Sequence, residues 1–340
     1  MHVGLIAPLS QPTPPATYGG VERVVAIHAA ELLRQGHRVT LFAADGSALP
    51  GARVFTYGPA GIWPAKRHLA RLVALLPSCR DLDLVHSFGR SLALLPWLLA
   101  PQPPLVQTYA CPLSARSIAL LDRLFAARIT YTVPSTWMRY RFPGKPASVA
   151  VVPNSLPLEQ YKEAKVQAAA GPLVFLGRFD PCKGLHTAIA TAIDAGLPLL
   201  VAGGAFDAAS RAYETDQIAP YRNHPLITFL GPVDDPAKQH LLANARALLF
   251  PIEWEEPFGI VMLEAMACGT PVIAFDRGAV PEVIEPGISG FIVSSQAEMV
   301  AAVGKLDQLD RRKVRASFSA RFGAPAVTTA YLQHYQAVCP

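Results

Sequence analysis

The chain has 340 residues, of which 51% are hydrophobic and 16% are charged, and it carries a formal net charge of +5. A single hydrophobic core stops growing at about 250 to 300 residues, so this length predicts two domains. The positive charge suits an anionic ligand or contact with anionic lipid. The basic residues form no stripe interleaved with aromatic residues, and we therefore expect no nucleic-acid partner.

The cysteines and the first residues of the chain indicate its compartment. Five cysteines are scattered without a C-x-x-C pair, which is typical of free thiols in a reducing cytoplasm. The apolar segment 2–7 lacks a basic n-region, and no apolar run reaches the ~18 residues of a membrane span. We therefore expect a cytoplasmic protein. For the basic cluster at 311–315 we expect a solvated helix face, with peripheral contact at the inner face of a membrane as the alternative.

Short apolar segments alternate with helical patterns along nearly the whole chain. This alternation predicts an α/β fold in which helices cover both faces of parallel sheets. The clearest helix covers 20–35 and is closed by Gly36. The strands predicted in the first half of the chain are 2–7, 38–43, 53–57, 84–88, 105–109, 129–133 and 148–152. Those predicted in the second half are 173–176, 199–202, 227–230, 247–251, 272–275 and 291–293.

A break in this pattern marks the expected domain boundary. Pro153 and Pro157 interrupt the alternation, and a polar, alanine-rich stretch follows them. We therefore expect two Rossmann-like domains, at 1–153 and 154–321. The last stretch, 325–338, is predicted to be helical.

Two glutamates, Glu256 and Glu264, flank a segment that predicts a helix starting near residue 257 or 258. At ~1.5 Å per residue the two carboxylates lie on the order of 10 Å apart, which is the scale of a nucleoside diphosphate sugar. Free amides at the helix start can bind a diphosphate, and the two acids can accept hydrogen bonds from hydroxyls. The alternative is a helix with one capping acid and one solvated acid.

The loops after strands are where ligands bind in open parallel sheets. Gly19 and Gly20 follow the first strand and a long loop, and paired glycines there let the backbone approach a phosphate or a sugar. Arg178 and Lys183 lie in the turn after the strand 173–176, where both can converge on a diphosphate. For each pair the alternative is an ordinary turn.

Two further strand ends carry candidate contacts for a sugar or an acceptor, His86 and Tyr109. A hydrogen-bonded structural histidine is the alternative for His86. Asp81 and Asp83 match a D-x-D metal motif, but they precede their strand and so belong at the edge opposite the expected site. We therefore expect no metal ion.

Together these residues resemble glycosyltransferase family 4, the retaining nucleotide-sugar transferases of GT-B fold. The resemblance spans nearly all of the chain. The matching pieces are Gly19-Gly20, Val152-Pro153-Asn154, Leu176-Gly177-Arg178 through Lys183-Gly184, Phe229 through Val233, and Glu256 through Glu264 continued to Val272. The resemblance implies two Rossmann-like domains with parallel sheets facing across a cleft. It also implies a C-terminal helix, about 322–340, that packs back on the first domain.

The resemblance implies a role for each candidate residue. Arg178 and Lys183 would grip the diphosphate, and Glu264 would hold the ribose. Glu256 would hold the donor sugar. The remaining donor contacts would come mainly from the backbone of Val233, at the base, and of Gly19, Gly20, Phe258, Gly259 and Ile260.

The implied reaction moves a hexose-type sugar from a UDP- or GDP-linked donor to a hydroxyl of a glycan, glycolipid or small molecule, with retention at the anomeric carbon. The leaving phosphate oxygen would take the acceptor proton, so neither a protein base nor a metal ion or other cofactor is implied. Cationic side chains and the helix dipole would stabilise the leaving diphosphate. Family members often carry histidines where Phe88 and Ala110 stand here, which leaves the identity of the sugar open.

Two other interpretations remain. An epimerase or hydrolase of the same fold would need acid and base side chains at the anomeric centre beyond Glu256. A non-catalytic sugar-nucleotide-binding protein would need only the donor site. A Rossmann oxidoreductase is excluded, because neither half has a G-x-G-x-x-G fingerprint after a strand with an acid ~20 residues further on.

Overall fold

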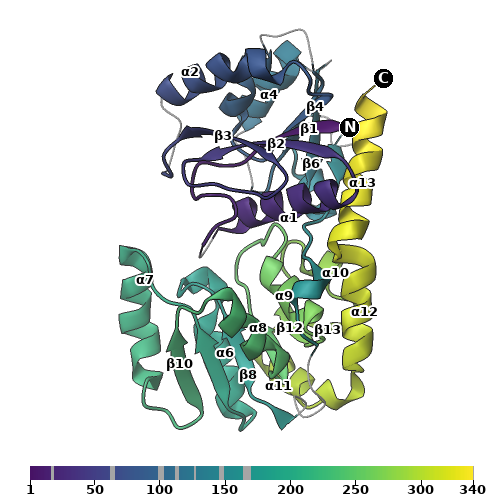
Figure 1. Ribbon diagram of the computed structural model, residues 1–340. Helices are drawn as coiled ribbons and strands as arrows, with labels where there is room; N and C mark the ends of the chain where they lie inside the picture. The colour runs from purple at the N-terminus through teal and green to yellow at the C-terminus, as the bar shows by residue number, and fades with distance from the viewer. Residues whose placement is uncertain are drawn as a thin grey trace. The chain divides into compact units, whose positions relative to one another are not determined.

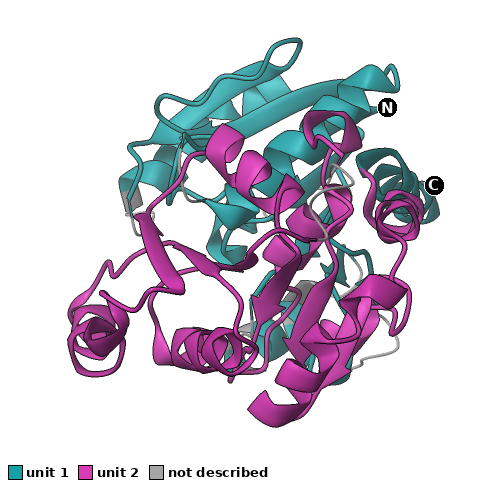
Figure 2. Ribbon diagram, turned by 90° about the horizontal axis from the view of Figure 1, so that it is seen from below, with its two compact units in different colours: residues 1–155, 324–340 teal, residues 156–323 magenta. Residues whose placement is uncertain are grey.

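The computed structural model describes residues 1–16, 19–61, 66–98, 103–111, 115–125, 128–144, 149–163 and 170–339. The chain divides into two compact units, which Figure 2 colours separately. Unit 1 comprises Met1–Ser155 and Ala324–Pro340, and unit 2 comprises Leu156–Gly323. Each unit is built on a parallel sheet with helices packed on it, so the predicted α/β class is confirmed (Figure 1).

Unit 1 contains a seven-stranded sheet in the order β3-β2-β1-β4-β5-β6-β7, in which every pair of neighbours is parallel. The strands are β1 (His2–Ile6), β2 (Arg38–Ala44), β3 (Arg53–Gly58), β4 (Leu84–Ser87), β5 (Leu105–Thr108), β6 (Ile129–Val133) and β7 (Val149–Val151). The strand order reverses direction between β1 and β4, and such a switch point is where open α/β sheets bind ligands.

Helices lie on both faces of this sheet, with α1 and α13 on one face and α2 and α4 on the other (Figure 1). The helices of unit 1 are α1 (Gly20–Arg34), α2 (Lys66–Leu75), α3 (Leu95–Leu98), α4 (Ala115–Phe125), α5 (Thr136–Tyr140) and α13 (Ala324–Val338). α1 ends one residue before its predicted end. Gly36 follows with a φ of 83°, a conformation that glycine adopts without strain and that commonly ends helices.

Unit 2 contains a six-stranded parallel sheet in the order β10-β9-β8-β11-β12-β13. The strands are β8 (Leu173–Leu176), β9 (Leu199–Ala202), β10 (Ile227–Gly231), β11 (Ala247–Phe250), β12 (Val272–Phe275) and β13 (Gly290–Val293). The helices are α6 (Leu185–Asp194), α7 (Ala208–Tyr213), α8 (Asp235–Ala243), α9 (Ile260–Ala267), α10 (Val280–Val283), α11 (Gln296–Val303) and α12 (Arg311–Phe322). The switch point of this sheet lies between the adjacent central strands β8 and β11.

All thirteen strands match the predicted segments to within one residue at either end. They could be recognised because strands of a parallel sheet are covered on both faces and therefore form short, nearly continuous apolar runs. β1, β4, β5 and β11 are buried along their whole length.

The basic cluster at 311–315 is not the solvated helix face that the sequence led us to expect. Arg311 donates to the carbonyl oxygen of Ala245 at 2.9 Å, and Arg315 donates to that of Ala267, the last residue of α9. Arg312, with a side chain 85% exposed, does face solvent. The prediction is therefore wrong for Arg311 and Arg315, which satisfy carbonyl groups at the ends of neighbouring segments.

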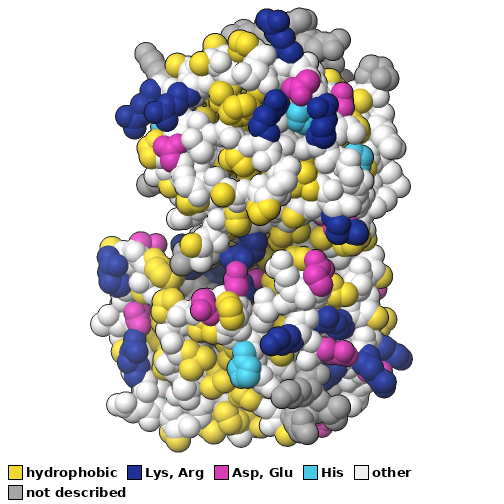
Figure 3. Space-filling model, in the orientation of Figure 1, with side chains coloured by type: hydrophobic (Ala, Val, Ile, Leu, Met, Phe, Trp, Pro, Cys, Tyr) yellow, Lys and Arg dark blue, Asp and Glu magenta, His cyan; other side chains and the backbone are white. Residues whose placement is uncertain are grey.

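The surface is mixed in charge. On the face of the molecule seen in Figure 3, basic and acidic side chains are interspersed and form no long basic stripe. Within the described ranges, no helix is both long and apolar enough to cross a bilayer.

Beneath α13, unit 1 contains a buried polar cluster. The Tyr335 hydroxyl lies 2.7 Å from Nε2 of His28 and 2.5 Å from Nδ1 of His86. The other ring nitrogen of His28, Nδ1, lies 3.2 Å from the Thr328 hydroxyl. The other ring nitrogen of His86, Nε2, lies 2.6 Å from the Thr108 hydroxyl. These contacts join the C-terminal helix α13 to α1, β4 and β5, although about 250 to 300 positions separate the partners in the chain.

Burial keeps both histidines neutral. It lowers the pKa of His28 to about 3, against the opposing charge of Glu31, and it lowers the pKa of His86 well below its ordinary value, helped by His28 and His334. In the unfolded chain both rings take up a proton below a pH of about 6.5. The folded state therefore binds fewer protons than the unfolded state in this range, and it loses stability as the pH falls.

We predict that the free energy of unfolding of unit 1 falls as the pH is lowered from 6 to 5, by about 1.4 kcal/mol per pH unit for each of His28 and His86. Urea denaturation across this range measures the slope. His28→Phe should reduce the pH dependence of the unfolding free energy by the contribution of one proton, because its ring no longer titrates in the unfolded chain. His240→Ala, at an exposed position on α8, should leave the pH dependence unchanged. Equal slopes for the wild type and His28→Phe would contradict this prediction.

Candidate functional site

The turn after β8 carries two of the predicted cationic residues. The Asp180 carboxylate accepts a hydrogen bond from the amide of Cys182 at 3.0 Å and so fixes the turn that ends at Lys183. Arg178 lies 3.4 Å from the same carboxylate. Hydrogen bonding from Cys182 holds the pKa of Asp180 below its ordinary value, against the opposing effect of partial burial. Asp180 is therefore anionic at neutral pH, and it orients both the turn and the guanidinium of Arg178.

Gly184 closes this turn in a left-handed conformation, with a φ of 70°. A Cβ atom at this position would lie 2.0 Å from the carbonyl oxygen of Pro251, which follows β11. Only glycine therefore lets the Lys183 turn approach the loop after the neighbouring strand this closely. The amide of Glu253 then donates to the carbonyl oxygen of Cys182 at 2.8 Å and joins the two loops.

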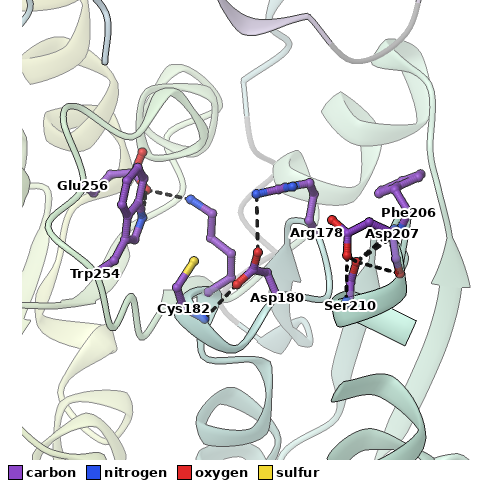
Figure 4. A network of polar contacts seen from close by, with 9 residues as sticks. Arg178, Asp180, Cys182, Phe206, Asp207, Ser210, Trp254 and Glu256 are labelled. Atoms are coloured by element: carbon purple, nitrogen blue, oxygen red, sulfur yellow. Dashed lines mark hydrogen bonds and ion pairs between the residues drawn. The ribbon is translucent and has the colours of Figure 1, made fainter. Parts of the chain in front are cut away.

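This approach brings Lys183 and Glu256 into contact. The Lys183 ammonium donates to Oε2 of Glu256 at 2.7 Å, and the two side chains are only 20% and 13% exposed. The indole N–H of Trp254 donates to the same oxygen at 2.8 Å. Figure 4 shows the guanidinium of Arg178 extending towards the side on which Glu256 lies. Arg178, Lys183 and Glu256 are thus brought together at the carboxyl edge of β8 and β11.

The helix after Glu256 begins later than the sequence predicts. α9 begins at Ile260, and Gly259 is its N-cap with a φ of 85° and without a side-chain cap. The predicted start near residue 257 or 258 is wrong, because the left-handed Gly259 cannot belong to the first turn. Phe258 is buried at 4% exposure and anchors the loop. The first-turn amides of Ile260 and Val261 can meet an anion, whereas the amide of Met262 donates to the carbonyl oxygen of Gly259 at 3.0 Å. Glu264 lies about one turn into the helix.

Glu264 has a partner that the sequence analysis missed. Its carboxylate accepts a hydrogen bond from the ammonium of Lys238 at 2.5 Å, and Lys238 also lies 2.9 Å from Asp235. The side chains of Lys238 and Glu264 are 13% and 6% exposed. Burial acts to lower the pKa of Lys238, but the Glu264 and Asp235 carboxylates outweigh it and raise this pKa. The i,i+3 spacing of Asp235 and Lys238 was visible in the sequence, but the contact with Glu264 spans 26 positions.

Val233 lies just after β10, partly exposed, in the loop that leads to α8. Gly231 at the end of β10 has a φ of 73°, and its carbonyl oxygen accepts a hydrogen bond from the amide of Gly203, after β9, at 2.9 Å. The loops after β8, β9, β10 and β11 therefore all begin at one edge of the unit 2 sheet.

The other candidate residues lie in unit 1. Gly20 is the first residue of α1 and Gly19 its N-cap; a Cβ atom at residue 19 would lie 2.7 Å from Cβ of Pro15. Residues 17 and 18 of the preceding loop lie outside the described ranges. The packing at Gly19 explains the need for a small residue there.

His86 and Tyr109 are buried in unit 1. His86 has both ring nitrogens engaged by Tyr335 and Thr108, as described above, which favours the structural alternative for this residue. The Tyr109 hydroxyl lies 2.7 Å from the Ser91 hydroxyl, and burial raises its pKa. A contact of either residue with a sugar or an acceptor stays a prediction.

The D-x-D pair lies where the sequence placed it, at the amino ends of the strands. Asp81 contacts Arg53 at 3.1 Å, and Asp83 accepts from the amide of His2 at 2.7 Å. Both acids therefore have partners at the edge of the sheet opposite the carboxyl ends. In the part of the chain that the structure describes, no three His, Cys, Asp or Glu side chains are grouped as a metal site would require.

Comparisons with known proteins agree with this arrangement. Residues 18–160 match the family model described as Glycosyltransferase Family 4, and residues 164–321 match the model described as Glycosyl transferases group 1. Together the two models span most of the chain. The chain therefore belongs to glycosyltransferase family 4, and the predicted resemblance is confirmed. It is an enzyme that transfers a sugar from a nucleotide-sugar donor.

Similar proteins show how widely this fold is used. The chain is 26% identical, over 94% of its length and 88% of the relative's, to a phosphatidyl-myo-inositol mannosyltransferase of Mycolicibacterium smegmatis. AviGT4, a glycosyltransferase involved in avilamycin A biosynthesis, has a similar fold, with a TM-score of 0.77, 24% identity and coverage of 100% of this chain and 98% of that one. Anabaena HepE, solved with UDP-glucose, has a TM-score of 0.74, 19% identity and coverage of 99% and 100%. The GT-B fold is confirmed.

We predict that Gly184→Ala destabilises unit 2 by more than about 2 kcal/mol. An alanine in the left-handed conformation costs ~1 kcal/mol or more. The new Cβ would in addition clash with the backbone of Pro251. Gly196→Ala is the matched control. Gly196 has a similar φ of 66°, but a Cβ atom at this position would have no other atom within 4 Å, so only the conformational penalty applies. Chemical denaturation measures both values, and equal losses would contradict the packing argument.

Proposed function

We propose that this enzyme is a retaining hexosyltransferase that moves a hexose from a UDP- or GDP-linked donor to a hydroxyl acceptor. The observation that supports this best is the contact of 2.7 Å between the Lys183 ammonium and the Glu256 carboxylate, at the switch point of the unit 2 sheet. The bond that must break joins the sugar to the leaving phosphate. Lys183 offers a cation for the phosphate, and Glu256 offers an acid for the hydroxyls of the sugar.

In this proposal the diphosphate is bound by three sources of positive potential. Arg178 offers a planar, bidentate guanidinium and Lys183 a compact charge. The uncapped first turn of α9 offers amides and the positive end of the helix dipole. The guanidinium of Arg178 is oriented by Asp180 and the amides are fixed by the helix, and Lys183 joins them when it turns from Glu256 to the phosphate. Together they can stabilise the charge that develops on the leaving diphosphate. That phosphate oxygen takes the proton of the acceptor hydroxyl, and the sugar keeps its anomeric configuration.

The nucleoside would be held about one turn further along α9, at Glu264. Lys238 binds one oxygen of Glu264, and the second oxygen can accept a hydrogen bond from a ribose hydroxyl. Val233, in the loop just after β10, would contact the base through its backbone. Glu256 would accept a hydrogen bond from a hydroxyl of the hexose. HepE, which has a similar fold, was solved with UDP-glucose, and this supports a hexose donor of this type.

We predict that at least one of UDP-glucose, UDP-galactose and GDP-mannose raises the melting temperature of the protein, since a ligand that binds only the folded state stabilises it. Lys183→Ala should abolish the shift, because the diphosphate loses its point charge. Lys305→Ala, at an exposed position of unit 2, should leave the shift unchanged. Stabilisation by NADH and by no sugar nucleotide would refute the proposal.

The reaction itself is followed by NMR of the product formed from the stabilising donor and a panel of hydroxyl acceptors. Retention of the anomeric configuration is expected, and Arg178→Ala should slow transfer by ~10²-fold or more. Inversion would exclude the proposed mechanism. Consumption of the donor without any glycosylated product would instead favour the hydrolase alternative.

We further propose that the enzyme works in the cytoplasm and contacts anionic lipid peripherally through unit 1. Arg67 and Arg71 on α2 are exposed, as are the apolar side chains of Val73 (49%) and Leu120 (58%) on α2 and α4. Exposed basic and apolar side chains on the same helix are typical of surfaces that lie against anionic bilayers. A lipid acceptor would suit such a surface, and the mycobacterial relative is named for one.

We predict that the protein co-sediments with vesicles of phosphatidylglycerol and that replacing both Arg67 and Arg71 by glutamate reduces the bound fraction severalfold. Each basic residue near an anionic surface contributes about 1 kcal/mol. Arg312→Glu, on the exposed face of α12, is the control and should bind as the wild type does. Binding that is equal for all three proteins, or absent in the wild type, would rule out this surface.

A further inference from the structure

Trp254 contacts both members of the Lys183–Glu256 ion pair. Its indole N–H donates to Oε2 of Glu256 at 2.8 Å, the same oxygen that accepts from Lys183. The Lys183 ammonium also lies over the indole ring, 5.2 Å from its centroid, within the range of a cation–π contact. Within the described part of the chain both donors bind Oε2, so Oε1 of Glu256 is left for a ligand.

The loop that carries Trp254 is held on both sides. The amide of Glu253 is bonded to Cys182, and the carbonyl oxygen of Glu256 accepts from the amide of Ala279 at 2.9 Å. Gly278, with a φ of 56°, packs so closely here that a Cβ atom would lie 2.2 Å from that carbonyl oxygen. The loop is therefore fixed by its backbone. Trp254, 37% exposed, is not needed as a core residue, and its two contacts with charged side chains point to a different role.

Donor binding must change the partners of Lys183. This argument rests on the function proposed above, in which Lys183 binds the donor diphosphate. As Lys183 turns to the phosphate, Glu256 loses its cation, and a carboxylate that is only 13% exposed is unfavourable without a partner. The indole N–H is then the donor that still holds Oε2. The face of the indole can keep the ammonium nearby while it exchanges the carboxylate for the phosphate.

We propose that Trp254 is a positioning residue, which holds Glu256 in the orientation that binds the donor sugar after Lys183 has moved to the diphosphate. Trp254 acts through Glu256 and need not touch the reacting atoms. It should therefore matter for the sugar part of the donor and not for the nucleoside diphosphate part.

The test measures these two parts separately and needs no acceptor. Dissociation constants of UDP and UDP-glucose, and of GDP and GDP-mannose, are determined by calorimetry for the wild type and for Trp254→Phe. Phenylalanine keeps a ring face for Lys183 but lacks the N–H donor. We expect the constant for the nucleoside diphosphate to stay within about twofold. The dissociation constant of the sugar nucleotide should rise about tenfold, which is the effect of losing one hydrogen bond to a charged group.

A double-mutant cycle shows whether Trp254 acts through Glu256. In the Glu256→Ala background the carboxylate is gone, so adding Trp254→Phe should have no further effect on sugar-nucleotide affinity. Trp137→Phe is the matched control, because Trp137 also carries a cation–π contact, with Arg141 at 4.0 Å, but lies in unit 1. It should bind all four ligands as the wild type does.

The outcomes are distinct. Unchanged sugar-nucleotide affinity in Trp254→Phe overturns the inference. An equal loss of affinity for UDP and for UDP-glucose also overturns it, as does a double-mutant cycle in which the effects of Trp254→Phe and Glu256→Ala add. In each of these cases the proposed function stands, because the wild type still binds the donor. If the wild type binds none of the four ligands, the proposed function fails and the inference fails with it.

Discussion

The ion pair between Lys183 and Glu256 is the interaction on which the proposed donor site depends. A site that binds a diphosphate must concentrate positive charge, and positive charge that is partly buried is unfavourable unless an acid is close by. Glu256 supplies that acid at 2.7 Å from the Lys183 ammonium. The backbone around the pair serves this contact. Gly184 lets the Lys183 turn meet the loop after β11, and Gly278 lets the segment after β12 meet Glu256.

The same principle is repeated about one turn further along α9. Glu264 is almost completely buried and is neutralised by Lys238, which Asp235 also contacts. Both acids of the Glu256–Glu264 segment thus have cationic partners. A donor that enters such a site exchanges existing contacts for new ones and does not bind to bare charges. Such a site favours ligands that replace every broken contact, because any group left unpaired in a buried position is costly.

The sequence predicted the architecture well and the helix boundary at the site less well. Thirteen strands could be placed because nearly continuous apolar runs of three to seven residues follow directly from burial on both faces. The start of α9 was placed too early, since Pro257 is a favourable first helical residue and only the left-handed Gly259 shows that the helix begins after it. Likewise, Arg311 and Arg315 were expected to face solvent because the sequence shows their charge but not their carbonyl partners, Ala245 and Ala267.

What the sequence determined by itself is the kind of residue at each strand end: two cations after β8, two acids around the start of α9, and glycines where the backbone must turn. These follow from local pattern and chemistry, which a single segment carries. Only the tertiary structure decided which of these groups meet. The strand order puts β8 beside β11, although 70 residues separate them in the chain, and so pairs Lys183 with Glu256. The contacts of Lys238 with Glu264 and of Tyr335 with His28 and His86 arise in the same way, from packing between distant segments that no local pattern encodes.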